Sequence, residues 1–375
     1  MSLILHVGHG KTGTSAIQTW LANNRALLLE EGIHYPGEES DANALAGKIN
    51  SGNRRSFERM TQFDDHTYLF SNENFFHDIT TQTAVGEKII QHSAQVDKVI
   101  IFTRDLFGML YSSWGQSVKR GGKTHTIEEM ASQFTFYNLL EKRLKTFESF
   151  NIPYELRNYS YHSKSIVQTF LTCVFNDEQQ AQRVYAKSTV FERPVNRSMT
   201  LAEYELQRQF NQFYGIGSSG IISDALVNSI PDIPSEKARI SEETVNQVIE
   251  SNAPSIEFIN TRLPDNEHIK TDYTFEFKEY DTTNFSFSGE QLKVLARQIS
   301  ASLKRRERRQ INNQEVAVIQ EVVSRAKVGK LPSTSQSEIL QQLVERLSGS
   351  PANEPNKEAL SLKQRLARYV RLKLR

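Results

Sequence analysis

A glycine-rich stretch near the N-terminus has the residue types and spacing that could do chemistry. Residues Gly8–Ser15 read GHGKTGTS, which combines three glycines, one lysine and three hydroxyl side chains. Glycines let the backbone approach a bound group closely, hydroxyls donate hydrogen bonds, and Lys11 adds a mobile positive charge. The combination predicts a site for a phosphate-like anion.

The segments on either side of this stretch predict how it is positioned. Residues 2–7 predict a short apolar strand, and Ala16–Glu31 predicts one helix that stops at Gly32. Backbone N–H groups at the start of such a helix point at an anion, and the helix dipole favours negative charge there. The lysine precedes the last glycine, so the spacing differs from the G-x-x-x-x-G-K-[ST] motif of nucleotide triphosphatases.

A second candidate group follows the clearest strand of the sequence. The continuous apolar run within Asp97–Thr103 predicts a strand buried on both faces, and a helix is expected after it through about Lys119. Arg104, at the end of this strand, offers a fixed charge and a bidentate fork that suits phosphate. Ser112, eight residues later and about two turns into the helix, could donate a hydroxyl to the same group.

Alternating strands and helices predict the fold class. Thr67–Ser71 and Tyr154–Tyr159 predict two further strands, helices are expected near 82–93 and 137–150, and the pattern is mainly helical from 162 to about 305. This order indicates an α/β fold with a P-loop-like parallel sheet flanked by helices, and a mainly helical C-terminal part and tail. Ligands of such sheets bind beyond the carboxyl ends of the strands.

Three candidate residues fall just past predicted strand ends. Lys11 follows the first strand, Glu73 follows the strand at Thr67–Ser71, and Arg104 follows the strand that ends at Thr103. We therefore expect three distant stretches of chain to converge on one site. Two local patterns add to the fold prediction: Gly32–Gly37 predicts a turn, and Thr126 with Glu129 fits a capping box at the start of a helix.

The two motifs together resemble those of a known enzyme family. The run Lys11-Thr12-Gly13-Thr14-Ser15 is similar to the 5′-phosphosulfate loop of sulfotransferases that use 3′-phosphoadenosine 5′-phosphosulfate (PAPS). The spacing of Arg104 and Ser112 resembles that of the arginine and serine that hold the donor's 3′-phosphate in that family. The stretches 32–36, 111–121 and 195–198 look like those of a bacterial, carbohydrate-type branch.

The resemblance implies roles for the candidate residues. The 5′ end of PAPS would be held by the loop residues Gly10, Lys11, Thr12, Gly13, Thr14 and Ser15. Lys11 would also stabilise the leaving phosphate as the product 3′,5′-bisphosphate (PAP) departs, and no metal is required. Glu73 is the preferred base for the acceptor's proton, because carbohydrate-modifying relatives use a glutamate, and His9 within the loop is the competing base.

The chain also departs from part of the family. It lacks the histidine-centred base motif and the C-terminal R-K-G loop of the enzymes that modify hormones and phenols, so their substrates are not carried over. A carbohydrate or glycolipid hydroxyl, or an amine, is the expected acceptor. Two other readings stay open: a P-loop small-molecule kinase using Mg-ATP, for which Asp105 could bind the metal, and a non-catalytic nucleotide-binding scaffold.

Composition limits the remaining possibilities. The 375 residues have a net charge of +1, which argues against a nucleic-acid partner, and the one cysteine, Cys173, is expected in the core. No apolar run is long enough to span a membrane, and the N-terminus has no basic leader, so the cytoplasm is the expected location. The sequence does not indicate an oligomeric state.

The C-terminal part of the chain differs in character from the rest. We expect a sulfotransferase-like domain over 1–305 and a helical tail with linkers over 306–375. Residues 357–375 carry seven Lys or Arg and one Glu, while the other residues are mildly acidic in sum. Ala359–Leu374 predicts a basic amphipathic helix, which could make weak peripheral contact with the inner surface of a membrane or pack on a protein surface.

Overall fold

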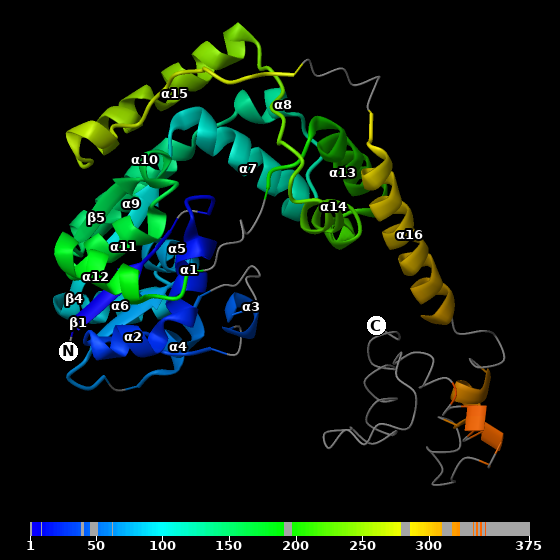
Figure 1. The fold of residues 1–375 in the computed structure, drawn as a ribbon, viewed down its shortest axis with the longest axis horizontal. Helices are drawn as coiled ribbons and strands as arrows, with labels where there is room; N and C mark the ends of the chain where they lie inside the picture. Colours follow the sequence, from blue (N-terminus) through cyan, green and yellow to red (C-terminus); the bar gives the residue numbers. More distant parts are fainter. Residues whose placement is uncertain are drawn as a thin grey trace. The chain divides into compact units, whose positions relative to one another are not determined.

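A computed structural model gives the fold of the chain (Figure 1). It describes residues 2–8, 10–38, 41–45, 52–61, 63–190, 197–278, 286–309 and 317–322, with isolated positions between 333 and 342. The chain divides into two compact units, residues 1–295 and 296–375, and every candidate site residue belongs to the first. The division between a domain at 1–305 and a tail stays a prediction, and residues 357–375 lie outside the described part.

The first unit is built on one parallel sheet. Its strands are β1 (Ser2–His6), β2 (Ile33–His34), β3 (Thr67–Ser71), β4 (Val96–Thr103) and β5 (Tyr154–Asn158), in the spatial order β2-β3-β1-β4-β5. All four pairings are parallel, for example Leu5 with Phe70 on β3 and Leu5 with Val99 on β4. The strands therefore end at a common edge, and the predicted α/β fold with a parallel sheet is confirmed.

Helices connect and cover these strands. Their bounds are α1 (Thr14–Asn23), α2 (Arg25–Glu30), α3 (Asp41–Leu45), α4 (Arg54–Arg59), α5 (Asn74–Thr81), α6 (Ala84–Gln91), α7 (Leu106–Gly121), α8 (Ile127–Ala131), α9 (Phe136–Ser149), α10 (Tyr159–His162), α11 (Ile166–Phe175) and α12 (Glu178–Lys187). They continue as α13 (Leu201–Tyr214), α14 (Ser223–Ser229), α15 (Glu242–Asn260) and α16 (Gly289–Arg309), with short 3₁₀ turns at Ser93–Gln95, Ser218–Gly220 and Asp265–Glu267.

Alternation along the strands divides the core into two layers. Leu3 and Leu5 of β1 pack into a cluster with residues of α5, α6, α7 and α9, while Ile4 packs into a second cluster with residues of α1, α11 and α12. Side chains of a strand alternate between the two faces of a sheet, so one apolar strand serves both layers. Strand β4 is buried along its length except at Asp97, as its apolar run predicts, and Cys173 is buried in the second cluster.

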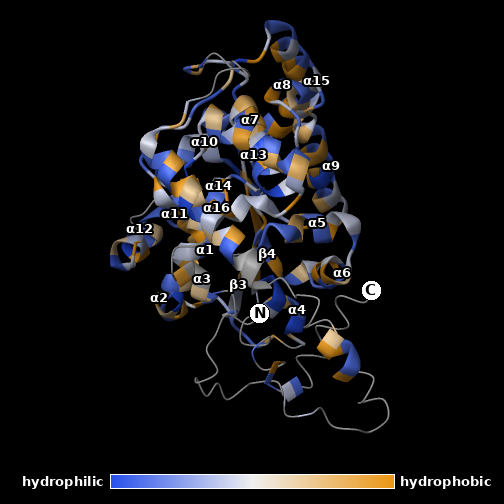
Figure 2. Ribbon diagram, turned by 90° about the vertical axis from the view of Figure 1, so that its right-hand side faces the viewer, coloured by the Kyte–Doolittle hydropathy of each residue, from blue (hydrophilic) through white to orange (hydrophobic). Residues whose placement is uncertain are grey.

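The helices that cover the sheet carry both polar and apolar residues. Figure 2 shows hydrophilic and hydrophobic residues alternating along α9 and α15, which pack against each other. The capping box at the start of α8 is present, since the Thr126 side chain accepts from the Glu129 N–H and the Glu129 carboxylate accepts from the Thr126 N–H. No helix among the described residues is long and apolar enough to cross a membrane.

Two local predictions are wrong. The single helix over Ala16–Glu31 breaks at Asn24, whose side chain donates to the carbonyls of Trp20 and Thr189 and accepts from the Thr189 N–H. The two bonds to Thr189, which is 165 residues away in the chain, hold Asn24 at the point where the helix divides into α1 and α2. The turn at Gly32–Gly37 contains the two-residue strand β2, because Ile33 and His34 pair with β3.

Candidate active site

The loop that follows β1 begins just after a buried histidine. His6 ends β1, and its Nδ1 lies 2.8 Å from the hydroxyl of Ser71 on β3. Burial lowers the pKa of His6 to about 3, so the ring is neutral at physiological pH. A Cβ atom on Gly8 would stand 2.6 Å from Oγ1 of Thr14 and 3.5 Å from Nε2 of His6, so only glycine lets the backbone pass here.

Two residues of the loop have left-handed backbone conformations. Gly13, with φ 82°, caps α1, and a Cβ there would stand 2.9 Å from both Ile166 and Tyr159. Lys11 has φ 78°, which residues other than glycine rarely adopt. The N-cap residue is Gly13, which has no side chain to cap the helix, so the positive end of this ten-residue helix adjoins the loop. Backbone strain of this kind gathers at ligand sites.

Arg104 lies against the same loop from the end of β4. Its Nη1 donates to the Lys11 carbonyl at 3.3 Å, and its guanidinium lies over the ring of Tyr159 at 5.3 Å. A Cβ on Gly108 would stand 3.0 Å from Arg104 Nε, so the arginine runs along the first turn of α7. The backbone at this strand end is fixed by the Tyr137 hydroxyl, which donates to the Arg104 carbonyl.

Ser112 shares a helix face with the arginine. It is half-buried on α7, four residues after Gly108, and residues four apart lie one above the other on a helix. Its hydroxyl is therefore on the side of α7 along which Arg104 runs. The shared phosphate contact that the spacing of the two residues predicts stays a prediction.

Glu73 reaches the loop from the end of β3. Its Oε2 lies 3.5 Å from the position a Cβ on Gly10 would take. Partial burial raises the pKa of Glu73. A hydrogen bond from Thr14 and the positive charge of Lys11 act in the opposite direction and lower it. A carboxylate with a raised pKa beside a cation is suited to accept a proton.

Further cations surround the ammonium group of Lys11. Partial burial lowers the pKa of Lys11. The positive charges of Lys119, Arg120 and Arg104 lower it further, and the negative charge of Glu73 raises it. Lys119 lies seven residues after Ser112 on α7. Its Nζ is 3.1 Å from the Asp224 carboxylate, which also accepts from Arg120 at 2.6 and 2.9 Å.

The structure thus brings the loop, Glu73, Arg104 and Ser112 to one edge of the sheet, while their roles stay predictions. Thr12 is buried and Ser15 is half-buried within the loop region. His9, the competing base, lies outside the described residues. Lys11 as a whole residue retains contact with solvent.

Asp105, the residue on which a metal-dependent kinase would depend, has a structural role. Its Oδ1 accepts from Asn158 Nδ2 at 2.8 Å and from the Lys270 N–H at 3.1 Å. Its own N–H donates to the Ser160 hydroxyl at 2.9 Å. These bonds join the end of β4 to the end of β5, so the carboxylate is engaged in holding the sheet edge together.

Sequence reasoning missed three residues of the site. In the sequence, His6 lies in a predicted apolar strand, and Lys119 marks the expected end of a helix and lies in the stretch 111–121. Tyr159, which contacts both the loop glycine and Arg104, follows β5 directly, as Lys11, Glu73 and Arg104 follow their strands. The sequence places Tyr159 as the last residue of the predicted strand Tyr154–Tyr159, and nearness to the carboxyl end of a strand is the signal that could have found it.

Comparisons with known proteins give one structural likeness. No family model matches the chain, and no curated protein matches it. Among solved structures, the chain is similar to a sulfotransferase from Alicyclobacillus acidocaldarius, with a TM-score of 0.32 and 11% sequence identity over 70% of this chain and 95% of that chain. We base the functional proposal below on the site residues of this chain.

Proposed function

We propose that this protein is a sulfotransferase that moves a sulfuryl group from PAPS to a hydroxyl or amine acceptor. One observation carries the proposal: the guanidinium of Arg104 donates to the carbonyl of Lys11, so the two anion-binding motifs of the sequence lie side by side. A donor with phosphate groups at both its 3′ and 5′ positions needs two such centres close together. A nucleoside triphosphate has its phosphates in one chain and needs only one.

The chemistry of the two centres fits the two ends of the donor. The start of α1 and the hydroxyls of Thr12, Thr14 and Ser15 offer donors for the 5′-phosphosulfate. Arg104 and Ser112 offer a charged fork and a hydroxyl for the 3′-phosphate. The ring of Tyr159 flanks both centres and supplies an apolar face beside them. The left-handed turn at Gly13 allows the close backbone approach that a phosphate requires.

The transfer step follows from this placement. The acceptor oxygen or nitrogen bonds to sulfur while the bond from sulfur to the bridging phosphate oxygen breaks, and PAP leaves. Lys11 neutralises the charge that develops on the leaving phosphate. Glu73, on the other side of Gly10, takes the proton that the acceptor loses. Positioning and charge neutralisation supply most of the rate in transfers of this kind.

The resemblance supports a further part of the proposal, the acceptor class. The loop and the stretches at 32–36 and 111–121 look like those of the bacterial, carbohydrate-type branch, so we propose a carbohydrate or glycolipid acceptor and a cytoplasmic enzyme. Glu73 as a base and Lys11 beside the leaving phosphate are consistent with sulfuryl transfer to a sugar hydroxyl.

Calorimetry with nucleotides tests the proposal. We expect PAP to bind the wild-type protein without Mg²⁺, and Arg104→Ala to weaken that binding. Tight binding of Mg-ATP without any binding of PAP would identify a kinase, and binding of neither would favour a scaffold. Transfer of radiolabelled sulfate from PAPS into cell-envelope glycans then tests catalysis, with Lys11→Ala as the inactive control.

A further inference from the structure

Two connecting segments contact the N-terminal half of α7. The first covers residues 236–240 and the second residues 270–278, and a parallel bridge joins them at Ala238 and Lys278. The Lys278 N–H donates to the Lys237 carbonyl at 3.0 Å. Neither segment has a role in the function proposed above.

Two aromatic residues of α7 hold these segments in place. The ring of Phe107 lies 4.7 Å from that of Tyr273, centroid to centroid. The Tyr111 hydroxyl donates to the Ala238 carbonyl and lies 3.1 Å from the Tyr273 hydroxyl. The carbonyls of residues 237 and 238 are therefore both bonded, so the backbone at Lys237 is fixed before any ligand arrives. A fixed group lowers the ordering cost of binding.

Exposure alternates along both segments, as it does along a strand. Lys237 and Arg239 are two residues apart, so their side chains lie on the same side of the first segment. Lys237 Nζ lies 4.4 Å from the ring centroid of Phe275, and the Arg239 guanidinium lies 5.0 Å from that of Phe277. The two cations thus contact the second segment in the same way, each over one ring.

The surroundings of Lys237 differ from those of Arg239, which is exposed. Burial lowers the pKa of Lys237, and the positive charge of Arg104 lowers it further. Within the part of the chain that the structure describes, neither Lys237 nor Arg104 forms an ion pair with a carboxylate. The neighbouring Lys278, in contrast, is paired with Glu236.

Lys237 and Arg104 reach this place from distant parts of the chain. Arg104 runs along the first turn of α7 beside Gly108, and Ser112 follows one turn later on the same side. Tyr111, which holds the segment of Lys237, directly precedes Ser112. Two cations without a carboxylate between them repel each other, and a bound anion removes that repulsion. The 3′-phosphate proposed for Arg104 and Ser112 is such an anion.

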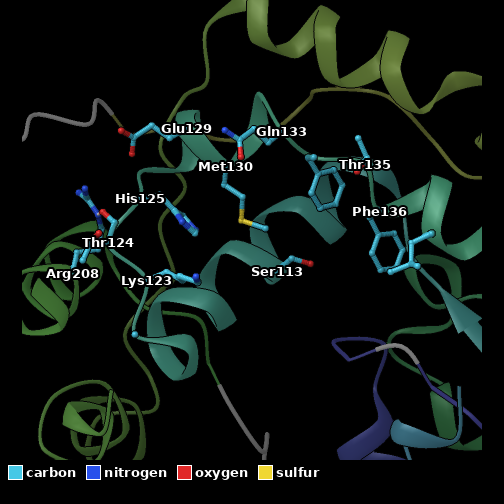
Figure 3. A pocket seen from close by; sticks show the side chains of 13 residues that line it. Ser113, Lys123, Thr124, His125, Glu129, Met130, Gln133, Thr135, Phe136 and Arg208 are labelled. Atoms are coloured by element: carbon cyan, nitrogen blue, oxygen red, sulfur yellow. The ribbon is translucent and has the colours of Figure 1, made fainter. Parts of the chain in front are cut away.

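The cleft beside α7 in Figure 3 does not contain these two cations. Ser113 of α7 lines this cleft of about 860 Å³, whereas Arg104 and Lys237 do not. Its Arg208 is already paired with the Glu205 carboxylate. The cations of the cleft and the pair formed by Arg104 and Lys237 are therefore separate groups.

We infer that Lys237 is a third binding residue for the 3′-phosphate of the donor, beside Arg104 and Ser112. The inference deepens the proposed function and rests on it for the identity of the donor. The ammonium group supplies a second positive charge and N–H donors, and a phosphate offers more acceptor positions than one guanidinium fork fills.

Calorimetry on the full chain with two ligands tests this role. PAP carries the 3′-phosphate, and adenosine 5′-phosphosulfate lacks it. We expect Lys237→Ala to weaken the binding of PAP by at least about tenfold, the scale of one charge-assisted hydrogen bond. Its affinity for adenosine 5′-phosphosulfate should change by less than about twofold. Lys237→Arg should retain most of the affinity for PAP, because it keeps the charge.

Arg239→Ala is the matched control, because it removes the same kind of cation from the same segment. Both alanine variants should lower the melting temperature by similar amounts, since each loses one cation–π contact. Arg239→Ala should change the affinity for PAP by less than about twofold, as expected for an exposed charge. Lys237→Met keeps the apolar stem over Phe275 and removes only the charge, so it repeats the test if the alanine variant does not fold.

Three outcomes would overturn the inference alone while PAP still binds the wild type. These are an unchanged affinity for PAP in the Lys237 variants, an equal loss in Lys237→Ala and Arg239→Ala, and an equal loss for the two ligands in Lys237→Ala. Failure of the wild-type protein to bind PAP would contradict the proposed function itself, and the inference with it.

Discussion

Replacement of Arg104 by alanine separates donor binding from folding. The side chain makes one 3.3 Å hydrogen bond to the Lys11 carbonyl and one cation–π contact with Tyr159. Burial lowers the pKa of Arg104, because removing the charged guanidinium from water is unfavourable in free energy. The two contacts and this cost oppose each other, so we expect the free energy of unfolding to change by only about 1 kcal/mol.

The effect on the donor should be much larger. A guanidinium that holds a phosphate makes charge-assisted hydrogen bonds worth roughly 1.5–3 kcal/mol each. Loss of a single bond at the upper value corresponds to about a 150-fold weaker affinity for PAP. Ser112→Ala removes a neutral donor worth about 1 kcal/mol, which corresponds to roughly a fivefold loss. Arg104→Lys keeps the charge without the fork and should fall between wild type and Arg104→Ala.

Calorimetry with two ligands reads out this prediction. PAP carries the 3′-phosphate, whereas adenosine 5′-phosphosulfate lacks it and should lose little affinity in either variant. Thermal unfolding of each variant shows that the fold persists. An equal loss of affinity for both ligands in Arg104→Ala would refute the 3′-phosphate contact and would assign the arginine to the loop alone.

Three further predictions concern the transfer step and the tail. Lys11→Ala should lower turnover by at least about a hundredfold while the fold persists, the scale of losing one preorganised charge donor; unchanged turnover in single-turnover assays would exclude the leaving-group role. Glu73 must be deprotonated to act as a base, so its raised pKa predicts that activity falls as the pH drops through a value above that of an ordinary glutamate; Glu73→Gln should abolish this limb of the pH–rate profile. Removal of residues 357–375 should weaken co-sedimentation with anionic vesicles at low salt, and unchanged binding would exclude the membrane role of the tail.

Local patterns in the sequence predicted most of the sheet. Strand β3 has the predicted bounds, and β1, β4 and β5 differ from the prediction by one residue at an end. Apolar runs of this length carry a strong signal, and so does the capping box at Thr126, because both depend on neighbouring residues only. The convergence of the loop with Glu73 and Arg104 followed from one further rule, that ligands of parallel sheets bind at the carboxyl ends of strands.

Long-range contacts account for the predictions that failed. The break of the first helix depends on Asn24, whose partner Thr189 is 165 residues away in the chain. Strand β2 exists only because β3 offers it an edge to pair with. No pattern within a short window contains such information.

The electrostatics of the site indicate that the fold is arranged for an anion. Lys11 lies among three other cations that lower its pKa, and its backbone has a left-handed conformation. Repulsion between like charges and backbone strain both destabilise the free protein, and Glu73 and Asp224 offset only part of the repulsion. An anion bound between these cations would reverse the repulsion and raise the pKa of Lys11 again. A ligand that binds only the folded state at a hundred times its dissociation constant stabilises the fold by about 2.7 kcal/mol, so we expect the donor to stabilise this protein.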